Sequence, residues 1–111
     1  MKVEDFVVQI RKSVVDENSV IDRELFEDTT TTVTDPYWIR ARSLYASLES
    51  EQQDILLEIM RQVAIDTVSN VFAIMDGVTE LEGQDGAVRV QCGADELSGE
   101  LQDRFLEQFE D

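Results

Sequence analysis

"EQQDILLEIMRQVAIDTVSNVFAIMD", residues 51 to 76, contains neither proline nor glycine, and Gly77 follows it as a helix stop signal. A helix of this length would measure about 39 Å. Apolar residues cover more than half of its circumference: Leu56, Ile59, Met60, Val63, Ala64, Val68, Val71, Phe72, Ile74 and Met75. We therefore expect a long central helix that the other helices surround, with Val63, Val71 and Ile74 in the core.

Two amphipathic segments are predicted near the N-terminus. Apolar residues recur at helical spacing over residues 3 to 16, which predicts the first helix. Asn18 has the side chain of an N-cap, so a second, short helix is expected over "NSVIDRELFEDT", with acids on its outer side. The β-branched run "TTTTVT", residues 29 to 34, predicts a loop.

Capping signals mark the next two helices. Asp35 before Pro36 predicts a helix start, because a carboxylate can cap and proline suits the first helical position. This third helix is expected to carry Tyr37 and Trp38 near its start. Ser50 followed by Gln53 has the spacing of a capping box and is expected to open the long helix.

Alternating residues follow Gly77. "TELEG" and "AVRVQC", joined by "QDG", predict a β-hairpin over about 79–92, in which Cys92 is a half-buried strand thiol. Ser98 is a plausible cap for a C-terminal helix with an apolar stripe that includes Leu101 and Phe105. The predicted fold class is α+β and predominantly helical, with four to five helices around a long central helix (about 51–76) and one β-hairpin (about 79–92) before a C-terminal helix. Residues 1–111 are expected to form a single acidic globular domain.

Charge is the most informative functional feature. Twenty-five Asp and Glu against nine Lys and Arg give a net charge of -16. Direct nucleic-acid binding and membrane binding are therefore not expected, since both use clustered Lys and Arg. The single cysteine and the absence of a signal-peptide pattern predict a reducing, cytoplasmic setting.

Acids concentrate in the last third of the chain. Residues 76–111 hold eleven acids and two Arg, which is nine of the sixteen net negative charges. Six of these acids are the predicted partner-binding residues: Glu80, Glu82, Asp85, Glu100, Asp103 and Glu107. Asp76, at the end of the long helix, opposes the helix dipole, and we expect it to cap the turn at Gly77 and Val78.

Catalytic, cofactor-binding and metal-binding residues are not predicted. The chain has no histidine, no glycine-rich phosphate loop and no zinc-ligand spacing, so we do not expect an enzyme or a cofactor. The predicted function is binding, with an acidic surface that engages a basic protein.

In size, charge and lack of catalytic residues, the chain resembles the small acidic inhibitors of bacteria and phages, a grouping that includes immunity proteins, antitoxins and DNA mimics. This resemblance implies an inhibitor that neutralises a toxin, a nuclease or another nucleic-acid-binding protein. The alternative is a structural or scaffold domain that forms a homodimer through apolar helix faces, in which the acidity only maintains solubility.

Overall fold

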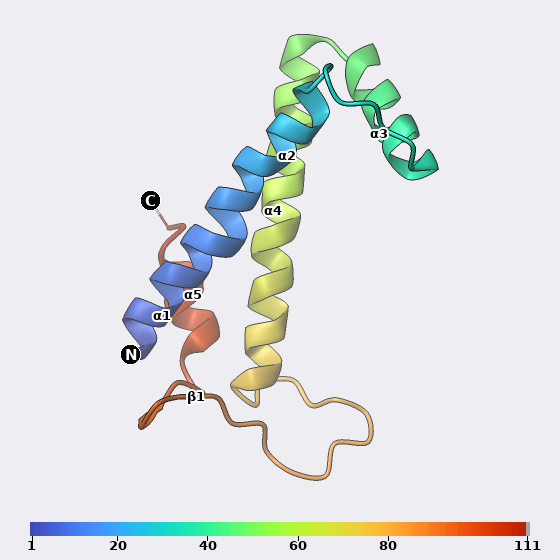
Figure 1. Ribbon diagram of the computed structural model, residues 1–111. Helices are drawn as coiled ribbons and strands as arrows, with labels where there is room; N and C mark the ends of the chain where they lie inside the picture. Colours follow the sequence, from blue (N-terminus) through green and yellow to red (C-terminus); the bar gives the residue numbers. More distant parts are fainter. Residues whose placement is uncertain (111) are drawn as a thin grey trace.

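The computed structural model describes residues 1–110. In chain order the elements are α1 (Val3–Ile10), a π-helical segment η1 (Arg11–Asp16), α2 (Glu17–Glu27), α3 (Pro36–Ser47), α4 (Ser50–Met75), β1 (Gln91–Cys92), β2 (Asp95–Glu96) and α5 (Leu101–Glu107). Figure 1 shows α4 as the central rod, with α1, α2 and α5 on one side of it and α3 projecting from its upper end on the other. The predicted class, predominantly helical α+β with a small hairpin before a C-terminal helix, is confirmed.

The first two predicted helices are one continuous rod. The residues at both junctions, Ile10 and Asp16, keep helical backbone angles, and η1 adds a wider turn without ending the helix. The prediction that Asn18 caps a new helix is therefore wrong. No proline or glycine lies before Pro36, so nothing in the backbone stops the first helix, and Asn18 is an exposed residue inside α2.

Helix α3 begins as predicted. Asp35 Oδ1 accepts the backbone N–H of Tyr37 at 2.9 Å, and Pro36 occupies the first turn. The helix is attached to α2 by an aromatic cluster, in which the Phe26 ring lies 5.7 Å from Trp38 and 5.0 Å from Tyr45. Helix α3 projects from the upper end of α4 (Figure 1), and we call it the arm.

Helix α4 has the predicted length, but its start differs by one residue. The capping box joins Glu49 and Gln52, and the Gln52 side chain accepts the Glu49 backbone N–H at 3.0 Å. The predicted pair of Ser50 and Gln53 is wrong. Gln53 instead donates to the Tyr45 carbonyl at 2.8 Å, which ties the end of α3 to α4.

The core lies around the C-terminal half of α4. Its buried members come from α1, η1, α4 and α5, together with one residue just after the hairpin: Val7, Val15, Ile65, Phe72, Leu97, Leu101 and Phe105. Phe105 is fully buried, and its ring meets Phe72 edge to face at 5.5 Å. This packing uses only one side of α4.

The expected core positions on α4 need correction. Val63 is 57% exposed and Val71 is 43% exposed, so neither is in the core, while Ile74 is half-buried. The sequence pattern could not show that helices would cover α4 from one side only.

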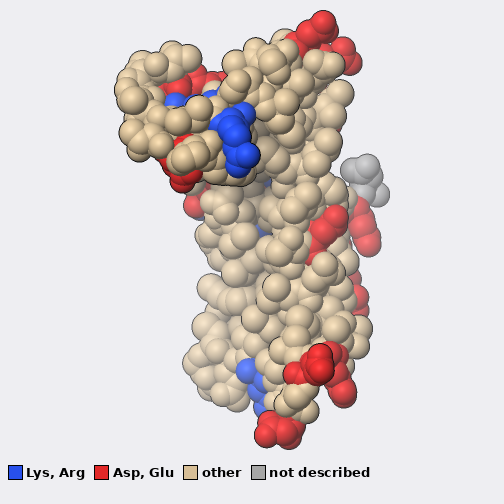
Figure 2. All heavy atoms as spheres, turned by 90° about the vertical axis from the view of Figure 1, so that its right-hand side faces the viewer, with Lys and Arg blue, Asp and Glu red and all other residues tan. Residues whose placement is uncertain are grey.

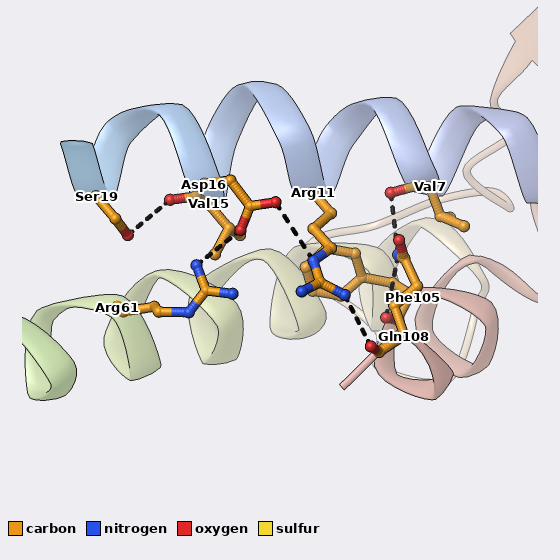
Figure 3. Close-up of polar contacts among 8 residues, drawn as sticks. All are labelled: Val7, Arg11, Val15, Asp16, Ser19, Arg61, Phe105 and Gln108. Carbon is orange, nitrogen blue, oxygen red and sulfur yellow. Dashed lines mark hydrogen bonds and ion pairs between the residues drawn. The ribbon is translucent and has the colours of Figure 1, made fainter. Parts of the chain in front are cut away.

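Polar contacts tie the N-terminal rod to α4 and α5 (Figure 3). Asp16 accepts from Arg61 of α4 at 2.8 Å and forms an ion pair with Arg11 at 3.4 Å. Arg11 also donates to the Gln108 carbonyl at 2.8 Å, and the Gln108 side chain donates to the Val7 carbonyl at 3.0 Å. The two bonds of Gln108 connect residues about a hundred positions apart and fix the end of α5 against α1 and η1.

The β-hairpin is shorter and later than predicted. Gln91 pairs with Glu96 and Cys92 with Asp95, so Gly93, with φ +60°, lies in the turn of the hairpin. No strand occurs within residues 79–90, which form a loop. The alternating pattern there has no partner strand to pair with, and alternation alone does not make a strand. Cys92 is a half-buried strand thiol, as predicted.

Candidate protein-binding surfaces

Asp76 is a structural residue that joins α4 to α5. Its carboxylate accepts three backbone N–H groups at the start of α5: Gly99 at 2.7 Å, Leu101 at 3.1 Å and Gln102 at 2.8 Å. The predicted role at Gly77 and Val78 is wrong, because those N–H groups donate to backbone carbonyls of α4. The acid that opposes the dipole of α4 therefore complements the dipole of α5.

Ser98 is not the cap of α5. Its hydroxyl accepts the Val90 backbone N–H at 2.6 Å, beside the hairpin. Asp76 takes the capping role from a position more than twenty residues earlier, which leaves Ser98 to hold the hairpin in place.

Three of the predicted partner-binding acids lie on the exposed loop of residues 77–90. Within residues 1–110, Glu80, Glu82 and Asp85 make no ion pair with a Lys or Arg side chain. The loop has some order of its own, since the Gln84 side chain accepts from Leu81 N–H at 3.0 Å and donates to the Gly86 carbonyl at 2.6 Å. These acids are therefore presented to solvent on a supported loop.

The other three predicted acids lie on α5 or directly before it, since Glu100 occupies its N-cap position. Arg104 lies 3.6 Å from Glu100 and 3.6 Å from Glu107, and it also reaches Glu4 of α1 at 3.8 Å. Asp103 is exposed and takes no part in these ion pairs. One guanidinium thus offsets part of the negative charge of this helix.

The structure does not bring the six acids together. Figure 1 shows α5 on one side of α4 and the loop extending below α4 toward the other side. A partner would meet two separate acidic surfaces, the loop surface (Glu80, Glu82, Asp85) and the α5 surface (Glu100, Asp103, Glu107).

A third acidic surface, which the sequence reasoning missed, is a groove between α2 and α4. This α2–α4 groove encloses about 540 Å³, and its charged lining residues are Arg23, Glu24, Glu27, Asp54, Glu58 and Arg61. Arg23 pairs with Glu27 of its own helix at 3.2 Å and joins α2 to α4 through Asp54 at 3.4 Å. The sequence did show an acidic outer side on residues 18–28. It could not show that α2 crosses α4, and this crossing adds Asp54 and Glu58 of α4 to the same groove.

The opposite side of α4 is almost uncharged. Among the five charged residues of α4, only Asp66 lies on the side facing away from the buried Ile65 and Phe72. Exposed apolar side chains occupy this side, including Ile59 at 55% and Val63 at 57%. Figure 2 shows a broad uncharged surface here, with Asp and Glu mainly at its borders.

Helix α3 borders this uncharged side. A hollow of about 420 Å³ between the two helices is lined mainly by apolar groups of α3 and α4, with Tyr37 and Leu44 on the arm and Leu56 and Met60 opposite. Tyr37 and Leu44 are more than half exposed. We define the α3–α4 face by Tyr37, Leu44, Ile59, Val63 and Val71.

No group of three or more Asp, Glu, Cys or His side chains suited to a metal ion occurs among the described residues. Within the same residues, no helix combines the length and apolar character that crossing a membrane requires. Comparisons with protein-family models, curated proteins and solved structures found no match.

Proposed function

We propose that this chain is an acidic protein-binding module that inhibits or neutralises a basic protein, in the manner of an immunity protein or a nucleic-acid mimic. The observation that supports this proposal is that most Lys and Arg side chains are paired with acids of the same chain, away from the loop surface. Within residues 1–110, five of the nine Lys and Arg side chains form ion pairs with the protein's own acids: Lys2, Arg11, Arg23, Arg61 and Arg104. The loop surface keeps its full negative charge.

Two of the acidic surfaces suit different parts of a partner. The α2–α4 groove places four carboxylates around a concave site, which suits an inserted Lys or Arg side chain. The loop surface is convex and exposed, and its charges act mainly by speeding the encounter with a basic protein. Binding would cover cationic residues that otherwise hold nucleic acid.

The experiment starts with affinity capture of a partner from the native cell extract, followed by stopped-flow association across a salt series. The loop variant carries Glu80→Gln, Glu82→Gln and Asp85→Asn. The control variant carries Asp5→Asn, Glu17→Gln and Glu96→Gln, which removes the same three charges at exposed positions elsewhere. Net charge changes from -16 to -13 in both proteins, because three negative charges are lost.

We expect the loop variant to associate roughly 10-fold more slowly at low salt, with the difference shrinking as salt screens the field. The control variant should associate nearly as fast as the wild type. Equal rates for the wild type and the loop variant at every ionic strength would remove the loop surface from the mechanism. Equal slowing in both variants would show that net charge matters and position does not.

A scaffold role is the second candidate function, and the exposed α3–α4 face favours it. That face is chemically unlike the acidic surfaces, since its binding energy would come from apolar burial. The two functions are compatible, because the α2–α4 groove and the α3–α4 face lie on different sides of α4.

A further inference from the structure

We propose that the α3–α4 face is the interface of a homodimer, in which a second copy of this chain covers the same face. This inference deepens the scaffold role proposed above, on which it rests, and it requires no basic partner. It rests on surface area, on the distribution of charge and on the shape of the hollow between α3 and α4, which we call the notch.

The chain exposes more surface than a compact protein of its mass. Its accessible surface is 7827 Å², whereas a compact protein of 12.7 kDa exposes about 6,200 Å². The Cα radius of gyration is 17.6 Å, against about 13 Å for a compact chain of 111 residues. The excess, roughly 1,600 Å² per copy, belongs to the whole elongated chain, and the five side chains that define the α3–α4 face, each more than 40% exposed, contribute to it. Burying about half of this excess on each copy would reach the standard size of a stable interface, about 800 Å² per partner.

Charge on the α3–α4 face permits two copies to meet despite a net charge of -16 on each. Asp66 is the only charged residue on this side of α4, and Arg40 of α3 lines the neighbouring notch. Helix α3 contains two arginines and no acid, so it carries +2 while the rest of the chain carries -18. A two-fold arrangement on this face therefore brings little negative charge of one copy against that of the other.

The notch explains how the same surface can serve both copies. Helix α3 and helix α4 form its two walls, and the apolar ridge of Ile59, Val63 and Val71 continues along α4 beyond it. With the two α4 helices antiparallel, each notch can receive the ridge of the other copy. A basic partner would find few carboxylates on this face, so a second copy fits it better.

The test is the mass in solution by sedimentation equilibrium and light scattering at micromolar concentration. The wild type should have a mass near 25 kDa, twice the 12.7 kDa of one chain. Val63→Glu on α4 and Leu44→Glu on α3 each place two carboxylates in the dimer interface. Each change should raise the dimer dissociation constant by roughly 100-fold or more.

Val8→Glu is the matched control. Val8 is a helical valine that is 50% exposed, compared with 57% for Val63, and it lies on α1, away from the α3–α4 face. This variant should remain a dimer with unchanged affinity. Circular dichroism and urea unfolding check that every variant is folded, and two variants on different helices guard against one that fails to fold.

A wild type that remains near 12.7 kDa up to about 100 μM would overturn the proposal, whether or not a basic partner binds. A dimer that neither Val63→Glu nor Leu44→Glu weakens would also overturn it, because the interface would then lie elsewhere. A monomer whose binding to a basic protein is lost in both variants would show that the face binds that partner instead of a second copy.

Discussion

The carboxylate of Asp76 accepts the backbone N–H of Gln102 at 2.8 Å, across 26 positions of sequence. Two further N–H groups, from Gly99 and Leu101, reach the same carboxylate. The first turn of α5 has no intrahelical partners for these donors, so a side chain from the end of α4 supplies them. The acid therefore fixes the start of the C-terminal helix, which carries the fully buried Phe105.

We predict that Asp76→Ala lowers the free energy of unfolding by about 1–2 kcal/mol, because it removes a helix cap. Asp85→Ala is the control, since Asp85 is an exposed loop acid without a hydrogen bond among the described residues. It should change stability by less than about 0.5 kcal/mol. Urea unfolding followed by circular dichroism measures both, and equal stability of the two variants would contradict the capping role.

We predict opposite outcomes for the same substitution at two helical valines. Val15 is fully buried whereas Val63 is 57% exposed. Val15→Asp should prevent folding, because an unpaired buried carboxylate costs several kcal/mol against a total stability of about 5–15. Val63→Asp should give a folded helical chain, even if its association state changes. Far-UV circular dichroism distinguishes them, and an unfolded Val63→Asp would mean that the exposed side of α4 is covered within one chain.

We predict that Tyr45 contributes to stability at neutral pH and loses that contribution in alkali. Burial, together with its hydrogen bond to Glu27 at 2.8 Å, raises the pKa of the Tyr45 phenol above its ordinary value. The unfolded chain releases this proton near pH 10 while the folded chain keeps it, so folding stability falls as pH rises from about 10 toward the folded pKa.

Tyr45→Phe should cost about 1 kcal/mol at neutral pH, through loss of the hydrogen bond to Glu27. It should also make the alkaline loss of stability shallower, since phenylalanine does not titrate. Urea unfolding of both proteins at neutral pH and at about pH 11 gives the comparison. A parallel alkaline decline in wild type and variant would show that Tyr45 ionises as freely when folded as when unfolded.

Local signals predicted the helices well. The long helix was expected over 51–76 and is observed as Ser50–Met75, and Asp35 caps α3 as predicted. These features depend on neighbouring residues, namely the absence of proline and glycine, a capping carboxylate, and a glycine that ends the helix. The continuity of α1 and α2 through η1 follows the same logic, although Asn18 misdirected the prediction.

For the six predicted partner-binding acids, the sequence could not show which of them share a surface. These acids are close together in the sequence, yet the loop surface extends below α4 whereas α5 runs along one side of it, and Arg104 offsets part of the charge on α5. The α2–α4 groove was missed because Glu24 and Glu27 meet Asp54 and Glu58 only where two helices cross. Charge counts along a chain do not reveal which charges share a surface.

By itself, the sequence determined the helix pattern, the acidic character and the absence of the usual catalytic motifs, because each depends on residue type or short spacing. Only the tertiary structure decided the partner of Asp76, the place of the hairpin and the exposed side of α4. Those features arise from contacts between residues far apart in the chain, and their free energy depends on how whole elements pack. An apolar helix with residues such as Val63 and Val71 has several sides that can be buried, and the packing of α1, α2 and α5 selects one of them.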